Sequence, residues 1–128
     1  MPHLILEYSS NLEGSTDLKD LCKLLAKTLQ ETKLFELGAI RVRALRSKTY
    51  VVADDLPQNA FLDASLRIGV GRTAEEKKRV GAALFAVLSD FFKPQFASPH
   101  FALSLEIREI DAELSWKKNA IHPRLRNS

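Results

Sequence analysis

Pro2 is the residue with the clearest chemical potential, because it directly follows Met1. Methionine before a residue as small as proline is normally removed, which would leave Pro2 with a free secondary amine in place of an amide. An α-amino group titrates slightly above neutrality, and proline's secondary amine is somewhat more basic. It accepts a proton at neutral pH when its cationic form is disfavoured. Pro2 is therefore a candidate acid/base residue.

Arginines are the groups that would disfavour the cationic form of that amine. With an effective dielectric of about 20, a guanidinium about 6 Å away opposes protonation by about 2.8 kcal/mol, or about two pKa units. Arg72 precedes a predicted helix start, where backbone amides and a guanidinium together can bind an anion. Arg41 and Arg43 alternate along a predicted strand, and their side chains suit carboxylates. For all three arginines, a solvated surface role is the alternative.

The first half of the chain predicts a strand, a helix and a second strand. Residues 3–8 alternate between apolar and polar side chains, which indicates a strand. Apolar residues then recur at helical spacing from Leu18 to about Lys33, and Cys22 lies among them as a core residue. A second strand follows from Gly38. The segment TYVVA, residues 49–53, predicts a short hairpin arm beside it.

The second half repeats this order. Residues 60–69 alternate as a strand, and Thr73 with Glu76 forms a capping box that begins a second helix. Pro94 marks the end of that helix, and the alternation from Phe101 to Ile107 predicts a final strand. The tail from Ile110 has no clear period.

Two strand-helix-strand halves of similar length indicate a duplicated β-α-β unit. We predict an α+β fold in one domain spanning residues 1–128, in which four strands form a mixed sheet with both helices on one face. Any apolar residues left uncovered on the opposite face would favour an oligomer.

Composition excludes several kinds of function. Cys22 is the only cysteine, so an intramolecular disulfide is impossible and a cysteine-built zinc site is not expected. The histidines and carboxylates lack the local spacing of a metal site, so no metal is expected. No apolar stretch approaches the length of a membrane span, and the start lacks a basic leader, so we expect no membrane partner and a cytoplasmic protein.

Two features of the sequence could suggest binding of a nucleotide or a nucleic acid, but neither is specific. GVGRTA, residues 69–74, matches a loose dinucleotide fingerprint, but the remaining chain is too short for a nucleotide-binding sheet. The net charge of +3 is spread among acidic residues, and no RNA-recognition signature is visible, so no nucleic-acid partner is expected.

Four segments together resemble the 5-carboxymethyl-2-hydroxymuconate isomerase family of the tautomerase superfamily. They are MPHLILEYSSNL, GAIRVRA, LRIGVGRTAEEK and FALSLEIREIDAELSWKKNAIHP, and they span nearly the whole chain. The resemblance implies a tautomerase-like fold, a homotrimer with active sites near subunit contacts, and no metal or organic cofactor. The implied reaction isomerises an unsaturated hydroxy-dicarboxylate from aromatic-ring degradation.

The resemblance also implies roles for individual residues. Pro2 would transfer the proton and Arg72 would bind or polarise an oxygen-bearing group of the substrate. Arg41 would help to hold the substrate, and Arg43 is a further candidate for substrate binding. Two alternatives remain open at this point: a non-catalytic oligomeric interaction protein on the same scaffold, and an enzyme of this fold acting on a different 2-oxo or enol substrate.

Overall fold

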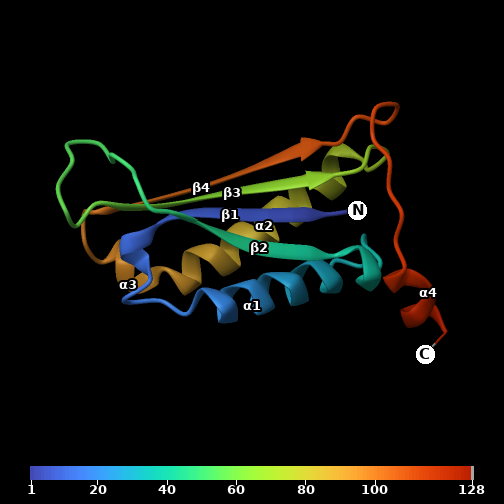
Figure 1. Cartoon of the computed structure of the whole chain (residues 1–128), viewed down its shortest axis with the longest axis horizontal. Coiled ribbons are helices and arrows are strands. Elements are labelled where there is room, and N and C mark those ends of the chain that lie inside the picture. Colours follow the sequence, from blue (N-terminus) through green and yellow to red (C-terminus); the bar gives the residue numbers. More distant parts are fainter. Residues whose placement is uncertain (128) are drawn as a thin grey trace.

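A mixed sheet carries two long helices on one of its faces in the computed structural model, which describes residues 1–127 (Figure 1). The elements follow the order predicted from the sequence, with short helical segments added between and after them. They are β1 (His3–Ser9), η1 (Ser10–Leu12), α1 (Leu18–Glu31), η2 (Leu37–Ala39), β2 (Arg41–Ser47), β3 (Ala60–Ile68), α2 (Ala74–Phe91), α3 (Lys93–Phe96), β4 (Phe101–Glu109) and α4 (Ile121–Arg126).

The strand order is β2-β1-β3-β4, and this order makes the duplication visible. β1 pairs with β2 in parallel, β3 pairs with β4 in parallel, and the two units meet through the antiparallel pair β1 and β3. Each parallel pair is connected through one helix, as a β-α-β crossover requires. The predicted α+β fold, with a four-stranded mixed sheet, is confirmed.

The core lies between the sheet and the two helices. Leu4 and Leu6 of β1 are fully buried, and so are Leu62 and Leu66 of β3, because alternate side chains of a strand point to the same face. α2 begins at the predicted capping box of Thr73 and Glu76, and α1 follows Asp17, whose carboxylate accepts from the Asp20 amide. Cys22 packs beside this core, as predicted, and burial raises the pKa of its thiol.

The predicted hairpin arm at residues 49–53 is wrong. Residues 48–59 form a loop that extends at the end of the sheet opposite to the amino terminus (Figure 1). Ala53 and Asp55 have φ values of 53° and 62°, and Asn59 Nδ2 donates to Val52 O at 3.0 Å. The chain must pass from β2 at the sheet edge to β3 on the other side of β1. The segment follows this crossing, held by the contact between Asn59 and Val52, and does not pair with the free outer edge of β2.

The start of the second strand also differs from the prediction. β2 begins at Arg41, and Gly38 lies in the short helix η2, against which α4 packs. A Cβ atom at Gly38 would lie 2.7 Å from His122 Nδ1 and 3.2 Å from the His122 backbone. Gly38 is therefore required for the close approach of α4.

Among residues 1–127, no helix is long and apolar enough to cross a membrane.

Replacing Gly38 by alanine is expected to displace α4. Because the clash involves the backbone of α4, side-chain rotation cannot relieve it, and overpacking of this kind costs about 1–3 kcal/mol. Urea unfolding and limited proteolysis of the carboxyl-terminal segment would measure the effect. Gly14→Ala is the matched control, since a Cβ atom there meets nothing within 4 Å. Equal stability and equal protease resistance of the two variants would contradict this account.

Candidate active site

The amino end of the chain enters the sheet at its centre. Pro2 is buried and directly precedes β1, which is flanked on both sides by β2 and β3. Its carbonyl accepts a hydrogen bond from the Arg41 amide at 3.1 Å, so the β1–β2 ladder extends to Pro2. The position of Pro2 is therefore set by the sheet.

Arg72 is held at the same end of the molecule. It follows Gly71, whose φ of 114° lets the chain turn between β3 and α2. Its guanidinium donates from Nη2 to Leu34 O at 2.9 Å and lies 4.5 Å from the ring centroid of Phe35. Arg72 is thus fixed against the segment that follows α1, while Glu76 is engaged in the capping box.

Gly69 marks the point where Arg72 approaches the amino terminus. A Cβ atom built on Gly69 would lie 3.9 Å from Arg72 Nη1 and 4.0 Å from the Met1 nitrogen. These two nitrogens are therefore within about 8 Å of each other, the sum of the two distances. Arg72 Nη1 also donates to Gly69 O at 3.4 Å. The absence of a side chain at Gly69 leaves open space between the amine and the guanidinium.

Arg41 and Arg43 lie on the sheet face opposite to the helices. Arg41 pairs in register with His3, and its Nη1 donates to Ala39 O at 2.8 Å. Arg43 lies two residues further along β2, and its Nη1 is 3.2 Å from His3 Nδ1. Arg41 therefore approaches the chain terminus, whereas Arg43 contacts His3.

The electrostatic environment disfavours protonation at this end of the sheet. The pKa of the Met1 amino group is lowered, first by burial and then by the positive charges of Lys117, Arg72 and Arg41. The pKa of His3 is lowered as well, by burial and then by Arg67, Arg43 and Arg41. An amine in this position remains a free base to lower pH than an ordinary amino group.

A cavity of about 360 Å³ opens beside the amino terminus. Met1, His3, Arg67 and Gly69 line one side, and the tail that follows β4 supplies Trp116 and Lys117 on the other. The sequence interpretation missed Arg67, Trp116 and Lys117. The alternation of β3 does place Arg67 on the polar face, but the tail has no period that would locate Trp116 or Lys117.

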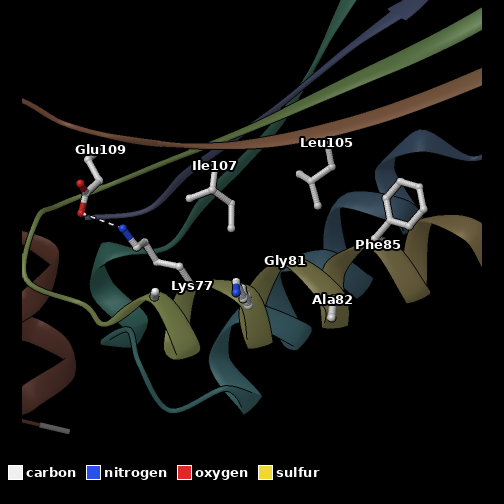
Figure 2. A pocket seen from close by; sticks show the side chains of 9 residues that line it. Lys77, Gly81, Ala82, Phe85, Leu105, Ile107 and Glu109 are labelled. Carbon is white, nitrogen blue, oxygen red and sulfur yellow. Dashed lines mark ion pairs between the residues drawn. The ribbon is translucent and has the colours of Figure 1, made fainter.

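A larger hollow of about 700 Å³ lies elsewhere, between α2 and β4 (Figure 2). It exists because Gly81 and Ala82 of α2 present little side chain toward Ile107 of β4. Lys77 lines this hollow, but its Nζ lies 3.5 Å from Glu109 Oε2, so its charge already has a partner. The cavity at the amino terminus is the better candidate site, because it brings a titratable amine together with the side chains of Arg67 and Lys117 and the carboxylate of Asp111. The four site residues predicted from the sequence do not themselves line this cavity: Pro2, Arg41, Arg43 and Arg72. Among residues 1–127, no three side chains of His, Cys, Asp or Glu cluster as metal ligands.

Comparison with known proteins finds relatives that match nearly the whole chain. A family model described as 5-carboxymethyl-2-hydroxymuconate isomerase matches residues 2–125. The chain is 35% identical over 122 residues to the 5-carboxymethyl-2-hydroxymuconate Delta-isomerase of Escherichia coli, a match that covers 95% of this chain and 97% of the relative.

Solved structures extend the comparison to the fold. A 5-carboxymethyl-2-hydroxymuconate isomerase from Deinococcus radiodurans R1 superposes with a TM-score of 0.92 at 44% identity, covering 98% of this chain and 94% of that chain. A symmetric trimer of fused 4-OT superposes with a TM-score of 0.67 at 14% identity, covering 91% and 93% of the two chains. This second likeness shows a tautomerase-like fold alone.

Proposed function

Because the chain belongs to the 5-carboxymethyl-2-hydroxymuconate isomerase family, we propose that it is a cofactor-independent isomerase that uses Pro2 as its acid/base residue. The observation that carries this proposal is the convergence of three elements on one point. The start of β1, the turn before α2 and the start of β2 bring the chain terminus, Arg72 and Arg41 together.

The mechanism begins with removal of Met1, which converts the Pro2 nitrogen from an amide to a secondary amine. Pro2 is buried and Met1 is half-buried, so the new amine forms in a partly enclosed position just before β1. Desolvation and the neighbouring cations then keep the Pro2 amine neutral. The neutral amine accepts the proton of the substrate's enol system and returns a proton to a different carbon, so the overall reaction conserves all atoms.

Arg72 and Arg41 stabilise the charge that develops between these two proton transfers. The dienolate formed after deprotonation carries negative charge on oxygen, and a fixed guanidinium stabilises that charge without reorganising. Arg72 is already fixed by Leu34 O and by Phe35, so it is suited to this task. Arg41 binds a substrate carboxylate beside it. Arg43 stays a candidate on the His3 side of the site.

The substrate is a hydroxymuconate-type acid. The name 5-carboxymethyl-2-hydroxymuconate describes a muconate, itself a dicarboxylate, with one further carboxymethyl group. A substrate of this kind carries one more carboxylate than the dicarboxylate inferred from the sequence. Its high negative charge matches the cations that surround the chain terminus.

We propose that the chain forms a homotrimer, the assembly that the family resemblance implies, and the open sheet face supports an oligomer. Arg41, His3, Arg67 and Arg108 occupy neighbouring positions on this face in β2, β1, β3 and β4. Arg108 is already paired with Glu106 at 2.7 Å, and the lowered pKa of His3 favours its neutral form. Acidic groups of a neighbouring subunit would therefore act mainly on Arg41 and Arg67. Analytical ultracentrifugation gives the mass of the assembly directly.

The proposed function is tested by measuring intact mass and isomerase activity on one preparation, with 5-carboxymethyl-2-hydroxymuconate as the substrate. Activity is expected only in protein that lacks Met1. Fully processed protein without activity on this substrate would contradict the proposal. It would favour a different 2-oxo or enol substrate, or a non-catalytic oligomeric protein.

The pH profile of kcat/KM is a further expectation. The base acts when it is unprotonated. Burial, Lys117, Arg72 and Arg41 lower the pKa of the Met1 amine, and we expect the same surroundings to lower the pKa of the Pro2 amine. His3, whose own pKa is lowered, adds little positive charge at neutral pH. The acid limb is therefore expected below the pKa of the free amine in a peptide that begins with proline. An acid limb at or above the pKa of that peptide would mean that the cations do not act on the base.

A further inference from the structure

The tail between β4 and α4, residues 110–120, forms a strap across the end of the sheet where the chain begins (Figure 1). The strap is attached at its start by the Ile110 amide, which donates to Ile68 O at 2.7 Å. It is attached at its end by Asn119 Nδ2, which donates to Gly38 O at 2.9 Å. Its course past Met1 is therefore fixed by contacts to both β-α-β units.

Internal hydrogen bonds also shape the strap. The Asp111 carboxylate accepts from the amides of Glu113 at 2.9 Å and Leu114 at 2.6 Å, which makes a turn near the start. At the other end, Asn119 Oδ1 accepts from the Ile121 amide at 2.7 Å and leads the chain into α4. The residues between these two turns bridge the cavity.

Lys117 is the residue of the strap that lies beside the chain terminus in two cavities. It lines the cavity of about 360 Å³ beside Met1, and it also lines a second cavity of about 250 Å³ that Met1 shares with Asn119. Lys117 therefore stands where the two cavities meet at the chain terminus. The neighbouring Lys118 is also exposed but lines neither cavity.

The three cations around the amine come from three different parts of the chain. Arg72 precedes α2, Arg41 begins β2, and Lys117 belongs to the strap. Both arginines are partly committed to backbone carbonyls, Arg72 to Leu34 and Arg41 to Ala39. Lys117 is exposed, so its ammonium is free to follow a carboxylate over several ångströms.

We propose that Lys117 is a substrate-binding residue that holds the substrate carboxylate on the strap side of the amine, while Arg72 and Arg41 bind the opposite part of the molecule. This inference rests on the proposed function, because it assigns one more cation to the same site. The ligand class is a small acid with three carboxylates. Lys117 recognises it as a flexible point charge, in contrast to the planar guanidinium of Arg72.

The role has two separable consequences for kinetics. Loss of a direct ionic contact weakens substrate binding, so Lys117→Met is expected to raise KM about tenfold. Loss of a positive charge near the amine also makes the amine easier to protonate, so the acid limb of the pH profile shifts to higher pH. The other charged or titratable groups around the amine are Arg72, Arg41 and His3, with Arg67 and Asp111 in the lining of the same cavity. The Asp111 carboxylate favours the protonated amine, but it is present in both lysine variants and does not alter the direction of the shift. A purely structural role for Lys117 would not combine these two changes.

The test compares Lys117→Met with Lys118→Met in the full chain. Binding of tricarballylate, a non-reactive tricarboxylate, is measured against glutarate, which has one carboxylate fewer. Trp116 is the only tryptophan and lines the cavity, so its fluorescence reports binding without turnover, and calorimetry provides a second readout. Wild type and Lys118→Met are expected to prefer tricarballylate about tenfold, and Lys117→Met is expected to lose that preference.

The outcomes separate this inference from the proposed function. If processed wild-type protein has no isomerase activity, the proposed function fails, and the binding preference alone then supports or overturns the role of Lys117. If wild type is active, Pro2→Ala is impaired and Lys117→Met behaves like Lys118→Met, the role of Lys117 is overturned. Equal losses in both lysine variants would also overturn it, since they would reflect a disturbed strap.

Discussion

Replacing Pro2 by alanine is expected to lower kcat about 100-fold. Alanine is also small enough for Met1 to be removed, so the variant keeps an amine but loses the rigid secondary amine of proline. General acid/base catalysis typically contributes about 10²–10⁴-fold, and the remaining primary amine places the loss near the lower end. A form that keeps a residue before Pro2 has an amide nitrogen at this position. It is expected to lose the whole contribution of acid/base catalysis by Pro2.

The control for this prediction is Pro57→Ala. Pro57 lies exposed in the loop between β2 and β3, at the end of the sheet away from the amino terminus. Steady-state kinetics on protein whose mass proves the absence of Met1 provides the comparison. If Pro2→Ala stayed within about threefold of Pro57→Ala, proton transfer by Pro2 would be untenable.

Replacing Arg72 by alanine is expected to lower kcat about 10²–10³-fold, the loss typical of removing one fixed donor to a developing oxyanion. The variant is also expected to be less stable by about 1–2 kcal/mol, because Leu34 O loses a charged donor at 2.9 Å. Arg72→Lys keeps the charge but cannot reach both Leu34 O and the substrate with one planar group, so an intermediate kcat is expected.

Arg79→Ala is the control that distinguishes an effect of Arg72 on catalysis from its effect on packing. Arg79 Nη1 donates to Thr32 O at 3.2 Å, so Arg79 and Arg72 hold the same segment after α1 through contacts of the same kind. Arg72 is one of the cations that lower the pKa of the terminal amine, whereas Arg79 is not among them. Urea unfolding should show comparable losses of stability for the two alanine variants, while only Arg72→Ala loses kcat. A comparable drop in kcat for Arg79→Ala would assign the effect to the segment that Arg79 and Arg72 both hold.

Local sequence patterns predicted the elements well where burial repeats at the period of a strand or helix. The alternation of β1 and β3 and the capping box of α2 depend on neighbouring residues only, so they can be read directly. The prediction for residues 49–53 was wrong because β-branched residues form a strand only when the chain places them beside a partner strand. The crossing from β2 to β3 carries this segment away from the free edge of β2.

The candidate site was predictable only in part for a similar reason. Pro2 and Arg72 stand beside recognisable signals, the chain start and a helix cap. Lys117 stands beside none, since the strap has no period and its position depends on distant contacts such as that between Asn119 and Gly38. The contact of Arg72 with Phe35 likewise joins residues that only the folded chain brings together.

The duplication of the β-α-β unit has a consequence for how many reactive centres one chain can hold. The position in the second unit that corresponds to Pro2 is Ala60, at the start of β3. Its nitrogen is an internal amide that donates to His100 O at 2.8 Å, so it cannot be a base. Joining two units in one polypeptide removes the free end of the second. Each chain therefore has one terminal amine for its two β-α-β units.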